Sequence, residues 1–494
     1  MKLLRNLFIL LTFVVVTSAW GDWKIQQEYW YSVTIDDTKS GWAKEMLEVD
    51  GDLMKTTTIQ EMSISRGGIV ITISVLSEFV ETRDGKPIYV KSIQEAMGQK
   101  SETTLVFKED TIEMTSVAGG DPIVKILPRP DATILTPRAV NRLFVQKVSE
   151  GASVITYQTI ASEFGAKAIT IVMTKTGEEE RDVLGKKTLV SMWTTENNVM
   201  PIIGSEVYTN EGVRVRSSVD AGFGDIINTL TTKHEAMSPI NEIPELMVSL
   251  FIEPNKPIPD DPQLKRLTLQ IKSRDGSVLD LPTSGAQRAT SNADGTVTLE
   301  IDLDAPVDAT PEELEDPVYL SVSSICDGSD EAVASIAREA LKKLPSDAST
   351  MDKALALRAK VYDFIEDKSM STAFASASQT ARDKKGDCSE HGVLLCGLLR
   401  SAGIPSRAVL GMVYIRRYRD APNGIFGWHM WSQALIDGKW IDLDATLRTT
   451  YSVGHVATTM TTLADESLAS EMVSIISTIG NLDVEVISIA DVAP

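Results

Sequence analysis

The hydrophobic and polar positions in the first half of the chain follow the pattern of strands. Segments 68–82 and 104–117 are rich in Val, Ile, Thr and Phe, the composition that favours strands. Turn signals with glycine recur between such segments, as at Asp50-Gly51 and Asp84-Gly85. We therefore predict that residues 22–237 form one large antiparallel sheet, curved or closed, with the shape of a barrel or half-barrel.

A proline-rich stretch follows this region. Its prolines cannot continue a helix or a central strand, so we expect a linker over residues 238–262. Segments 264–278 and 296–304 then have the pattern of strands. They predict a small β module over residues 263–328. The acidic segment 304–317 is expected to be a solvated loop. The prolines of the linker are Pro239, Pro244, Pro254, Pro257, Pro259 and Pro262.

From Glu331 onward the apolar residues recur at the spacing of helices, as in Val333, Ile336 and Ala337. Further strands come after these helices. The pattern predicts an α+β domain over residues 329–460. The C-terminal extension, residues 461–494, is expected to hold a helix followed by a strand, at 467–479 and 483–489. The fold class is therefore multidomain.

Length and charge narrow the range of functions. The chain has 494 residues, too many for a single core. Its formal net charge is −21 at pH 7, spread along the whole sequence. A field of this sign repels phosphate backbones and anionic lipid heads, so nucleic-acid binding is not expected. Nothing in the sequence indicates an oligomeric state.

The first 21 residues have the layout of a secretory signal peptide. Lys2 and Arg5 precede the apolar run 7–16, and small residues follow it. We expect cleavage after Ala19 or Gly21 and export to the periplasm or the medium, with an uncleaved membrane anchor as the alternative. No later segment is long and apolar enough to cross a membrane.

The mature chain would keep three cysteines, Cys326, Cys388 and Cys396. Cys388 and Cys396 cannot pair within one helix, because eight residues span about 12 Å and a disulfide requires Cα atoms within about 7 Å. At least one thiol is therefore expected to be free. Cys396 lies among leucines in the middle of the predicted helix, which is typical of a small buried hydrophobic residue.

Cys388 has a different setting, at the predicted start of that helix. Asp387 is a good N-cap and Glu390 completes a capping box. Gly403 suits the position after the helix end, and Pro405 prevents continuation. At the first helical position the unpaired N–H groups and the helix dipole favour a thiolate. The sequence therefore makes Cys388 a candidate nucleophile, although a buried structural cysteine remains the alternative.

A thiolate nucleophile needs a histidine, and the chain has four. His429 lies in a predicted strand that leads to an Asp437-Gly438 hairpin turn. His234 is expected at the surface, and we assign no role to His455 because it follows a predicted loop. His391, one turn from Cys388, is interpreted as a solvated or supporting residue. No further ligands at metal-binding spacing are evident, so no metal is expected.

Five motifs follow one another between residues 331 and 451. In this order and with these gaps the segment resembles the transglutaminase-like superfamily, relatives of the papain-fold thiol enzymes. Met430 and Ala445 stand where the family often has Ala and Pro, and neither position carries the chemistry. The motifs are Gly386-Asp387-Cys388, Leu398-Leu399-Arg400, AGIPSR at 402–407, His429-Met430-Trp431 and WIDLDAT at 440–446.

This resemblance implies a catalytic triad. Cys388 would be the nucleophile, His429 the general base and acid, and Asp444 the residue that orients His429. The activity implied is acyl transfer from amide substrates through a thioester, in a peptidase, an amidase or a cross-linking enzyme. The substrate would be a protein or peptide, and no cofactor is implied. The alternative is an envelope binding or structural protein whose β-rich region binds a peptide, glycan or lipid, with an accessory or inactive thiol domain.

The hairpin turn also predicts which aspartate meets His429. A two-residue turn at Asp437-Gly438 pairs Gln433 with Asp442. Asp444 then follows on the same face, as a diagonal neighbour of His429, because side chains alternate along strands. Asp442 is one step further away. We therefore expect Asp444 and not Asp442 to be the orienting residue.

Overall fold

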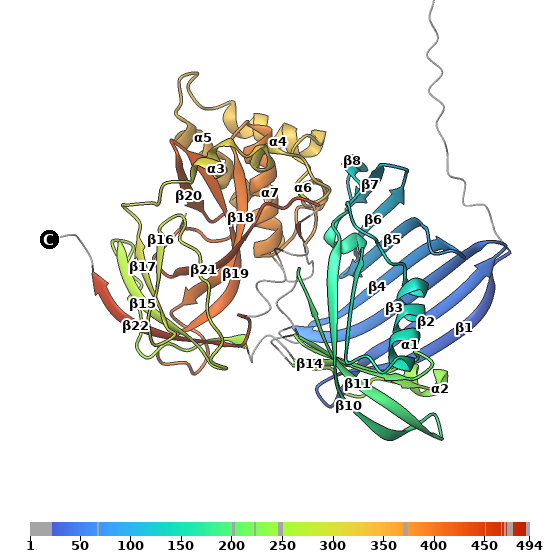
Figure 1. Cartoon of the computed structure of the whole chain (residues 1–494). Helices are drawn as coiled ribbons and strands as arrows, with labels where there is room; N and C mark the ends of the chain where they lie inside the picture. Colours follow the sequence, from blue (N-terminus) through green and yellow to red (C-terminus); the bar gives the residue numbers. More distant parts are fainter. Residues whose placement is uncertain are drawn as a thin grey trace, which may run out of the picture.

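A computed structural model describes residues 22–66, 69–199, 203–221, 224–245, 250–368, 374–449, 451–465, 467, 468, 471 and 478–490 (Figure 1). Figure 1 shows a large curved sheet beside a second body that contains most of the helices and two smaller sheets. The predicted signal peptide lies outside the described residues, and so does most of the predicted helix 467–479. No helix among the described residues is long and apolar enough to span a membrane.

The N-terminal sheet is an antiparallel half-barrel of 14 strands. Strand β1 pairs with both β2 and β14, so the last strand of the region returns to the first. The other strands follow one another as hairpins and leave β8 and β9 as the two edges. The prediction of one large antiparallel sheet is confirmed in its half-barrel form. The strands are β1 (Lys24–Ile35), β2 (Thr38–Asp50), β3 (Leu53–Arg66), β4 (Ile69–Thr82), β5 (Pro87–Ala96), β6 (Gln99–Phe107), β7 (Thr111–Val117), β8 (Ile123–Pro128), β9 (Val154–Thr159), β10 (Ile169–Val183), β11 (Lys186–Asn197), β12 (Gly204–Thr209), β13 (Arg214–Asp220) and β14 (Asp225–Thr231).

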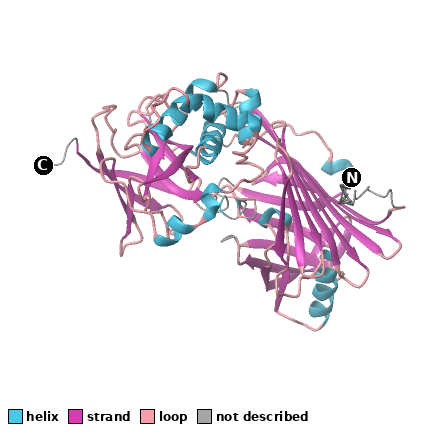
Figure 2. Cartoon of the chain, turned by 90° about the horizontal axis from the view of Figure 1, so that it is seen from above, coloured by secondary structure: helices cyan, strands magenta, loops and turns pink. Residues whose placement is uncertain are grey.

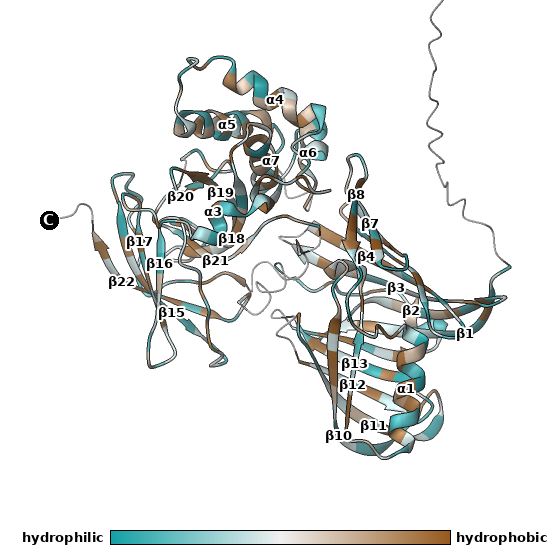
Figure 3. Ribbon diagram, turned by 45° about the horizontal axis from the view of Figure 1, so that its top comes forward, coloured by the Kyte–Doolittle hydropathy of each residue, from teal (hydrophilic) through white to brown (hydrophobic). Residues whose placement is uncertain are grey.

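Helix α1 (Pro137–Ser149) connects β8 to β9 and packs against the half-barrel. It begins where Thr136 caps the backbone N–H of Ala139, and a proline occupies the first turn. Phe144 of this helix is buried against Trp193 and Tyr208, with ring centroids 5.5 and 4.6 Å away. In Figure 3 the strands around α1 carry both hydrophobic and hydrophilic positions, as expected for a sheet with one face covered. The half-barrel region also holds the short helices η1 (Ser162–Phe164) and α2 (Lys233–Ala236).

The proline-rich segment touches both bodies of the molecule. Ser65 of the half-barrel donates its backbone N–H to the carbonyl of Pro244, at 2.7 Å. Further along, Ile252 forms an antiparallel bridge with Phe426 in the second body. The segment is therefore attached by backbone hydrogen bonds to both bodies.

A small sheet follows, in the order β16-β17-β15-β22. Its strands are β15 (Arg266–Ser273), β16 (Gln287–Ser291), β17 (Val297–Asp302) and, from the far end of the chain, β22 (Leu482–Ala490). The expected solvated loop at 304–317 is wrong in part, because a short helix, α3 (Pro311–Glu315), forms within it. Thr310 and Glu313 make a capping box around a first-turn proline, which stabilises this helix. The short helix η3 (Pro317–Leu320) comes next.

The remaining elements form an α+β region with a third sheet, in the order β20-β19-β18-β21. Figure 2 shows the helices of this region gathered together on one side. Residues of the third sheet, among them Met412, Phe426 and Val456, share a hydrophobic core with the small sheet. The elements are α4 (Glu331–Leu341), α5 (Thr350–Phe364), α6 (Ala377–Asp383), α7 (Cys388–Ser401), β18 (Ser406–Ile415), β19 (Ile425–Ile436), β20 (Lys439–Leu443) and β21 (His455–Thr461).

Candidate active site

Helix α7 holds Cys388 at its first position. Asp387 accepts the backbone N–H of Ser389 at 2.9 Å, and Glu390 accepts that of Asp387, also at 2.9 Å. The predicted capping box is therefore present. Every residue from Ser389 to Arg400 is buried, so the helix is enclosed by the domain and its first residue has a fixed place.

The three cysteines differ in their access to solvent. Cys326 and Cys396 are fully buried, whereas Cys388 is partly exposed. Burial raises the pKa of the Cys326 thiol to about 12 and raises that of Cys396 as well. All three thiols are free. Cys388 is thus the cysteine that a reagent or substrate can reach.

The hairpin of β19 and β20 forms with the predicted register. Asp437 and Gly438 both have positive φ, 51° and 77°, as a two-residue turn of this kind requires. Gln433 pairs with Asp442, and the ladder ends one pair later. Asp444 itself has left the strand and carries the chain into the next loop.

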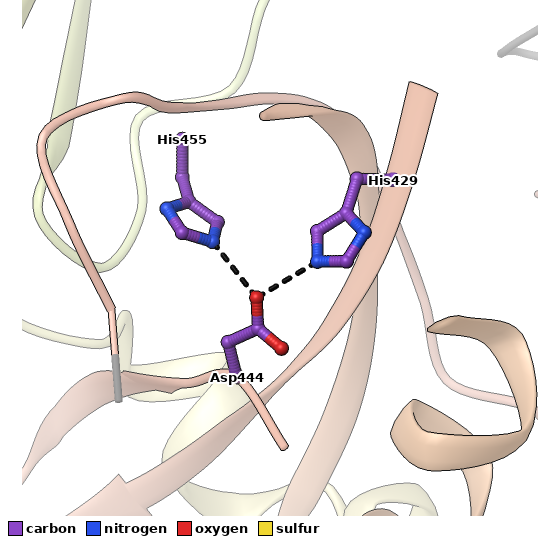
Figure 4. Close-up of side chains that lie close together, drawn as sticks. All are labelled: His429, Asp444 and His455. Atoms are coloured by element: carbon purple, nitrogen blue, oxygen red, sulfur yellow. Dashed lines mark hydrogen bonds and ion pairs between the residues drawn. The ribbon is translucent and has the colours of Figure 1, made fainter. Parts of the chain in front are cut away.

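His429 and Asp444 are in direct contact. Nε2 of His429 lies 2.8 Å from Oδ2 of Asp444, and both side chains are buried (Figure 4). The other carboxylate oxygen, Oδ1, accepts the backbone N–H of Thr446 at 2.7 Å and that of Leu447 at 3.3 Å. The Asp444 carboxylate is therefore fixed by its own loop and directed at the histidine.

His455 is a second imidazole on the same carboxylate. Its Nε2 lies 3.0 Å from Oδ2 of Asp444, so this nitrogen carries the proton (Figure 4). His455 is fully buried, and its ring stacks on Tyr451 with centroids 4.2 Å apart. Sequence reasoning gave His455 no role, because only the pairing of β18 with β21 brings this distant strand to the site. Gly411 of β18 pairs with His429, and a side chain at this position would collide with the backbone of Val456 and press on the ring of Trp431.

This arrangement shifts the pKa values of His429 and Asp444. Burial disfavours a charged imidazole at His429, but hydrogen bonds to Asp444 and to Cys388 outweigh it and raise its pKa to about 10. Burial would raise the pKa of the Asp444 carboxyl, yet hydrogen bonds from His429 and His455 hold it well below its usual range. His429 is therefore an imidazolium at neutral pH. Asp444 holds its Nε2, which leaves Nδ1 for the thiol.

The sequence over these elements matches a known family. Residues 334–445 fit the family model of the transglutaminase-like superfamily. This segment is a transglutaminase-like domain. The match supports a thiol-type enzyme in general terms and extends to neither the half-barrel nor the small sheet.

The solved structures that match this chain have low sequence identity to it. A candidate cysteine protease from Cytophaga hutchinsonii is 18% identical, covers 46% of this chain and 86% of its own, and has a TM-score of 0.27. A β-barrel-like protein of a domain of unknown function from Brucella abortus is 10% identical, covers 42% and 95%, and has a TM-score of 0.33. The periplasmic domain of TgpA from Pseudomonas aeruginosa is 16% identical, covers 40% and 88%, and has a TM-score of 0.25. At such scores none of them carries an argument about function. No curated protein matches the sequence significantly.

Within the transglutaminase-like domain, Arg358 of α5 fixes the loop that bears Asp444. Its guanidinium donates to the backbone carbonyl oxygens of Asp444, at 2.6 Å, and of Thr449, at 2.8 Å, and also to that of Leu447. The side chain is only 6% exposed. Sequence reasoning missed it, because a single arginine on an amphipathic helix has the pattern of a solvated position.

Asp442 has a different role from Asp444. Its Oδ1 accepts hydrogen bonds from Trp431 Nε1 at 2.9 Å and from Gln433 Nε2 at 2.8 Å. Its Oδ2 accepts the backbone N–H of Ala286 at 2.9 Å. Asp442 therefore joins the third sheet to the chain segment before β16 and does not contact His429.

The remaining histidines lie outside the contact between His429 and Asp444. His234 is exposed, as expected. Of the two interpretations of His391, the solvated one is wrong and the supporting one agrees with its contacts, because this side chain is fully buried and its Nδ1 donates to the carbonyl of Asp387 at 2.6 Å. Desolvation lowers the pKa of His391 to about 4, so the ring is neutral at physiological pH. It supports the start of α7 from inside the domain.

Three side chains of the site have the chemistry of metal ligands. His429, Asp444 and His455 bring three possible ligand atoms within 4.8 Å of one another. Ligation would require a lone pair on both Nε2 atoms. Each Nε2 instead lies at hydrogen-bond distance from the same carboxylate oxygen. The three side chains therefore fit a hydrogen-bonded group better than a metal centre.

Proposed function

We propose that this protein is an exported thiol enzyme that transfers acyl groups from amide substrates, with Cys388, His429 and Asp444 as its catalytic triad. The observation that carries the proposal is the placement of His429. Its imidazolium is held through Nε2 by a buried carboxylate and interacts with the thiol at the start of α7. This is the relationship that a cysteine nucleophile needs with its base.

The reaction would proceed in two halves. In the first, the Cys388 thiolate, paired with the His429 imidazolium, attacks the amide carbonyl carbon, and the developing oxyanion meets the backbone N–H at the helix start. His429 then gives its proton to the leaving amine, the C–N bond breaks, and a thioester remains. In the second half, water or another amine attacks the thioester while His429 takes its proton. The carbon–sulfur bond breaks and the thiolate is restored.

A cavity lined by Phe374, which contacts the start of α7, supports a polypeptide substrate. A cavity of about 370 Å³ lies between the half-barrel, at Gln94 and Thr103, and the other body, at Ile325 and Phe374. The backbone N–H of Phe374 lies 3.4 Å from Oγ of Ser389, the neighbour of Cys388. We propose that an extended peptide lies in this cavity and delivers its amide carbonyl to Cys388.

Incubation with an unfolded protein tests the proposed activity. Casein would be supplied with dansylcadaverine, and three products measured: new peptide termini, released ammonia and amine-labelled casein. New termini would define a peptidase, ammonia alone an amidase, and labelled casein a cross-linking enzyme. The activity should vanish in Cys388→Ala and persist in Cys396→Ala, whose thiol is buried. Equal activity in Cys388→Ala would overturn the proposal.

Export is proposed from the charged start, the apolar run 7–16 and the small residues that follow. N-terminal sequencing of the protein purified from its native host should begin near Trp20 or Asp22. An intact Met1 on soluble cytoplasmic protein would contradict export. It would leave the proposed chemistry untouched.

A further inference from the structure

The half-barrel contains a cavity of about 370 Å³ that is separate from the cysteine site. It lies between helix α1 and the strands β1, β2, β9, β10, β12 and β13. Figure 1 shows α1 in the half-barrel and α7 in the other body. A volume of this size is within the range of small-molecule sites.

Aromatic rings make up much of the cavity wall. Tyr29, Tyr31, Tyr157 and Tyr208 line it together with Phe144. Desolvation raises the pKa of Tyr31 to about 12 and raises those of the other three tyrosines. The hydroxyls therefore stay neutral at physiological pH, and the rings offer flat apolar faces to a ligand.

Arg138 and Arg214 also line the cavity, and some of their N–H donors have no hydrogen-bond partner in the protein. Arg214 stands over the ring of Tyr31, 5.4 Å from its centroid, and its Nη2 lies 3.5 Å from a carboxylate oxygen of Glu45. Its Nε is buried and has no hydrogen-bond partner. The Nε of Arg138, on α1, is likewise buried and without a hydrogen-bond partner. Solvent does not reach either Nε, so a ligand in the cavity would meet the accessible part of the guanidinium groups, and these N–H donors favour a ligand that supplies oxygen atoms.

The carboxylates Glu45 and Glu206 attract Arg214, but only Glu45 accepts a hydrogen bond from it. Glu45 meets Arg214 only at 3.5 Å, which is a weak contact. Glu206 accepts the hydroxyl of Tyr208 at 2.6 Å, and Glu211 is exposed at the rim. Arg214 is 30% exposed although protein surrounds it, so its free edge faces the cavity.

We propose that this cavity binds a small organic acid. The carboxylate of the ligand accepts hydrogen bonds from Arg214 and Arg138, and its apolar body lies against Phe144 and Met173. An ammonium ligand offers only donors to the N–H groups of the two guanidinium groups and is disfavoured. A neutral ligand of the same shape fits the walls but leaves the arginine donors unmatched. The proposal does not depend on the chemistry at Cys388.

Titration calorimetry with three matched probes tests this inference. Decanoate, decan-1-ol and decylammonium share one apolar body and differ in the charge of the head group. We expect decanoate to bind the full mature chain with one site per molecule and at least about tenfold more tightly than decan-1-ol, because one charge-assisted hydrogen bond contributes on this scale. Decylammonium should bind more weakly than either.

Variants locate the site. Arg214→Met alone would leave Glu45 without its cation, so the double variant Arg214→Met/Glu45→Gln is also measured. Both should bind decanoate only as well as decan-1-ol, with the decan-1-ol affinity unchanged. Val140→Trp fills the cavity and should abolish binding of both probes. Arg181→Met is the matched control, because this arginine pairs with Glu179 on the surface of β10.

Three results would overturn the inference. The first is that decanoate shows no saturable binding, and the second is that decanoate and decan-1-ol bind with equal affinity. The third is that both Arg214 variants keep the wild-type affinity for decanoate while their melting curves match that of the wild type. Binding should also be the same in Cys388→Ala. This arm separates the inference from the proposed enzyme activity, since either one can fail without the other.

Discussion

His429 and Asp444 lie 2.8 Å apart, Nε2 to Oδ2, although the ladder that joins their strands stops at Leu443. The contact therefore depends on the loop that Asp444 begins and not on strand pairing. Backbone N–H groups of Thr446 and Leu447 and the guanidinium of Arg358 hold that loop. Any change that frees the loop should weaken the pair.

Replacement by asparagine should have different effects at Asp444 and at Asp442. Asp444→Asn removes the charge that holds His429 as an imidazolium and presents an amide N–H to its Nε2–H. We expect the acylation rate to fall by a factor on the order of 10³ or more, with little change in the fold. The rate is measured as release of p-nitrophenolate from an activated ester.

Asp442→Asn should act on stability instead. Its carboxylate accepts from Trp431, Gln433 and Ala286, and an amide cannot accept from all three. We expect a loss of about 1–3 kcal/mol in unfolding free energy, with an acylation rate per folded molecule within a few-fold of the wild type. The reverse ranking of the two variants would mean that Asp442 orients the histidine.

Replacement of His455 tests its role as a positioning residue. His455→Leu removes one of the hydrogen bonds that keep the Asp444 pKa low, so that pKa should rise. The acid limb of the pH–rate profile should move to higher pH, and the maximal rate should fall about tenfold. His455→Gln can still donate from Nε2 and should restore most of both properties. A wild-type pH–rate profile and maximal rate in His455→Leu would show that the residue only fills the core.

The raised pKa of His429 predicts how stability depends on pH. Its folded value of about 10 exceeds the ordinary value of about 6.5, so protonation favours the folded state. This stabilisation is complete below pH 6.5 and disappears as pH rises through 10. Between pH 6.5 and 9 the unfolding free energy should fall by roughly 3 kcal/mol more in the wild type than in His429→Gln. The unfolding free energy is measured by urea unfolding at each pH. An equal change of this free energy with pH in the two proteins would contradict the raised pKa of His429.

Blocking the cavity between the two bodies should separate small from large substrates. Gln94 is an exposed residue of β5 that lines this cavity. Gln94→Trp should raise KM for casein severalfold and leave the rate with p-nitrophenyl acetate unchanged. Lys187→Trp, on the exposed β10–β11 hairpin, is the control. Unchanged kinetics on casein would show that peptides reach Cys388 by another route.

Local features of the site could be predicted from the sequence because neighbouring residues determine them. The capping box at Asp387 and Glu390 is set within four residues, and the Asp437-Gly438 turn fixes the register of its hairpin. The helix at 311–315 could also have been found, since Thr310 and Glu313 carry the same capping signal.

Contacts between distant segments could not be predicted in this way. His455 reaches Asp444 only because β21 pairs with β18, and Arg358 reaches the loop only because α5 packs beside it. The half-barrel cavity likewise joins residues from six strands and a helix. Packing of the whole chain decides each of these, and no short stretch of sequence encodes it.

The central claim is that Cys388 forms a covalent thioester with an acyl donor, and acid-quench mass spectrometry measures this directly. The mature protein is mixed with p-nitrophenyl acetate for seconds, quenched at low pH, digested and mapped. We predict one added acetyl group on the peptide that carries Cys388. Neutral hydroxylamine should remove it, and Asp444→Asn should slow its appearance. Acetylation confined to other residues, or an equal p-nitrophenolate burst from Cys388→Ala, would contradict the account.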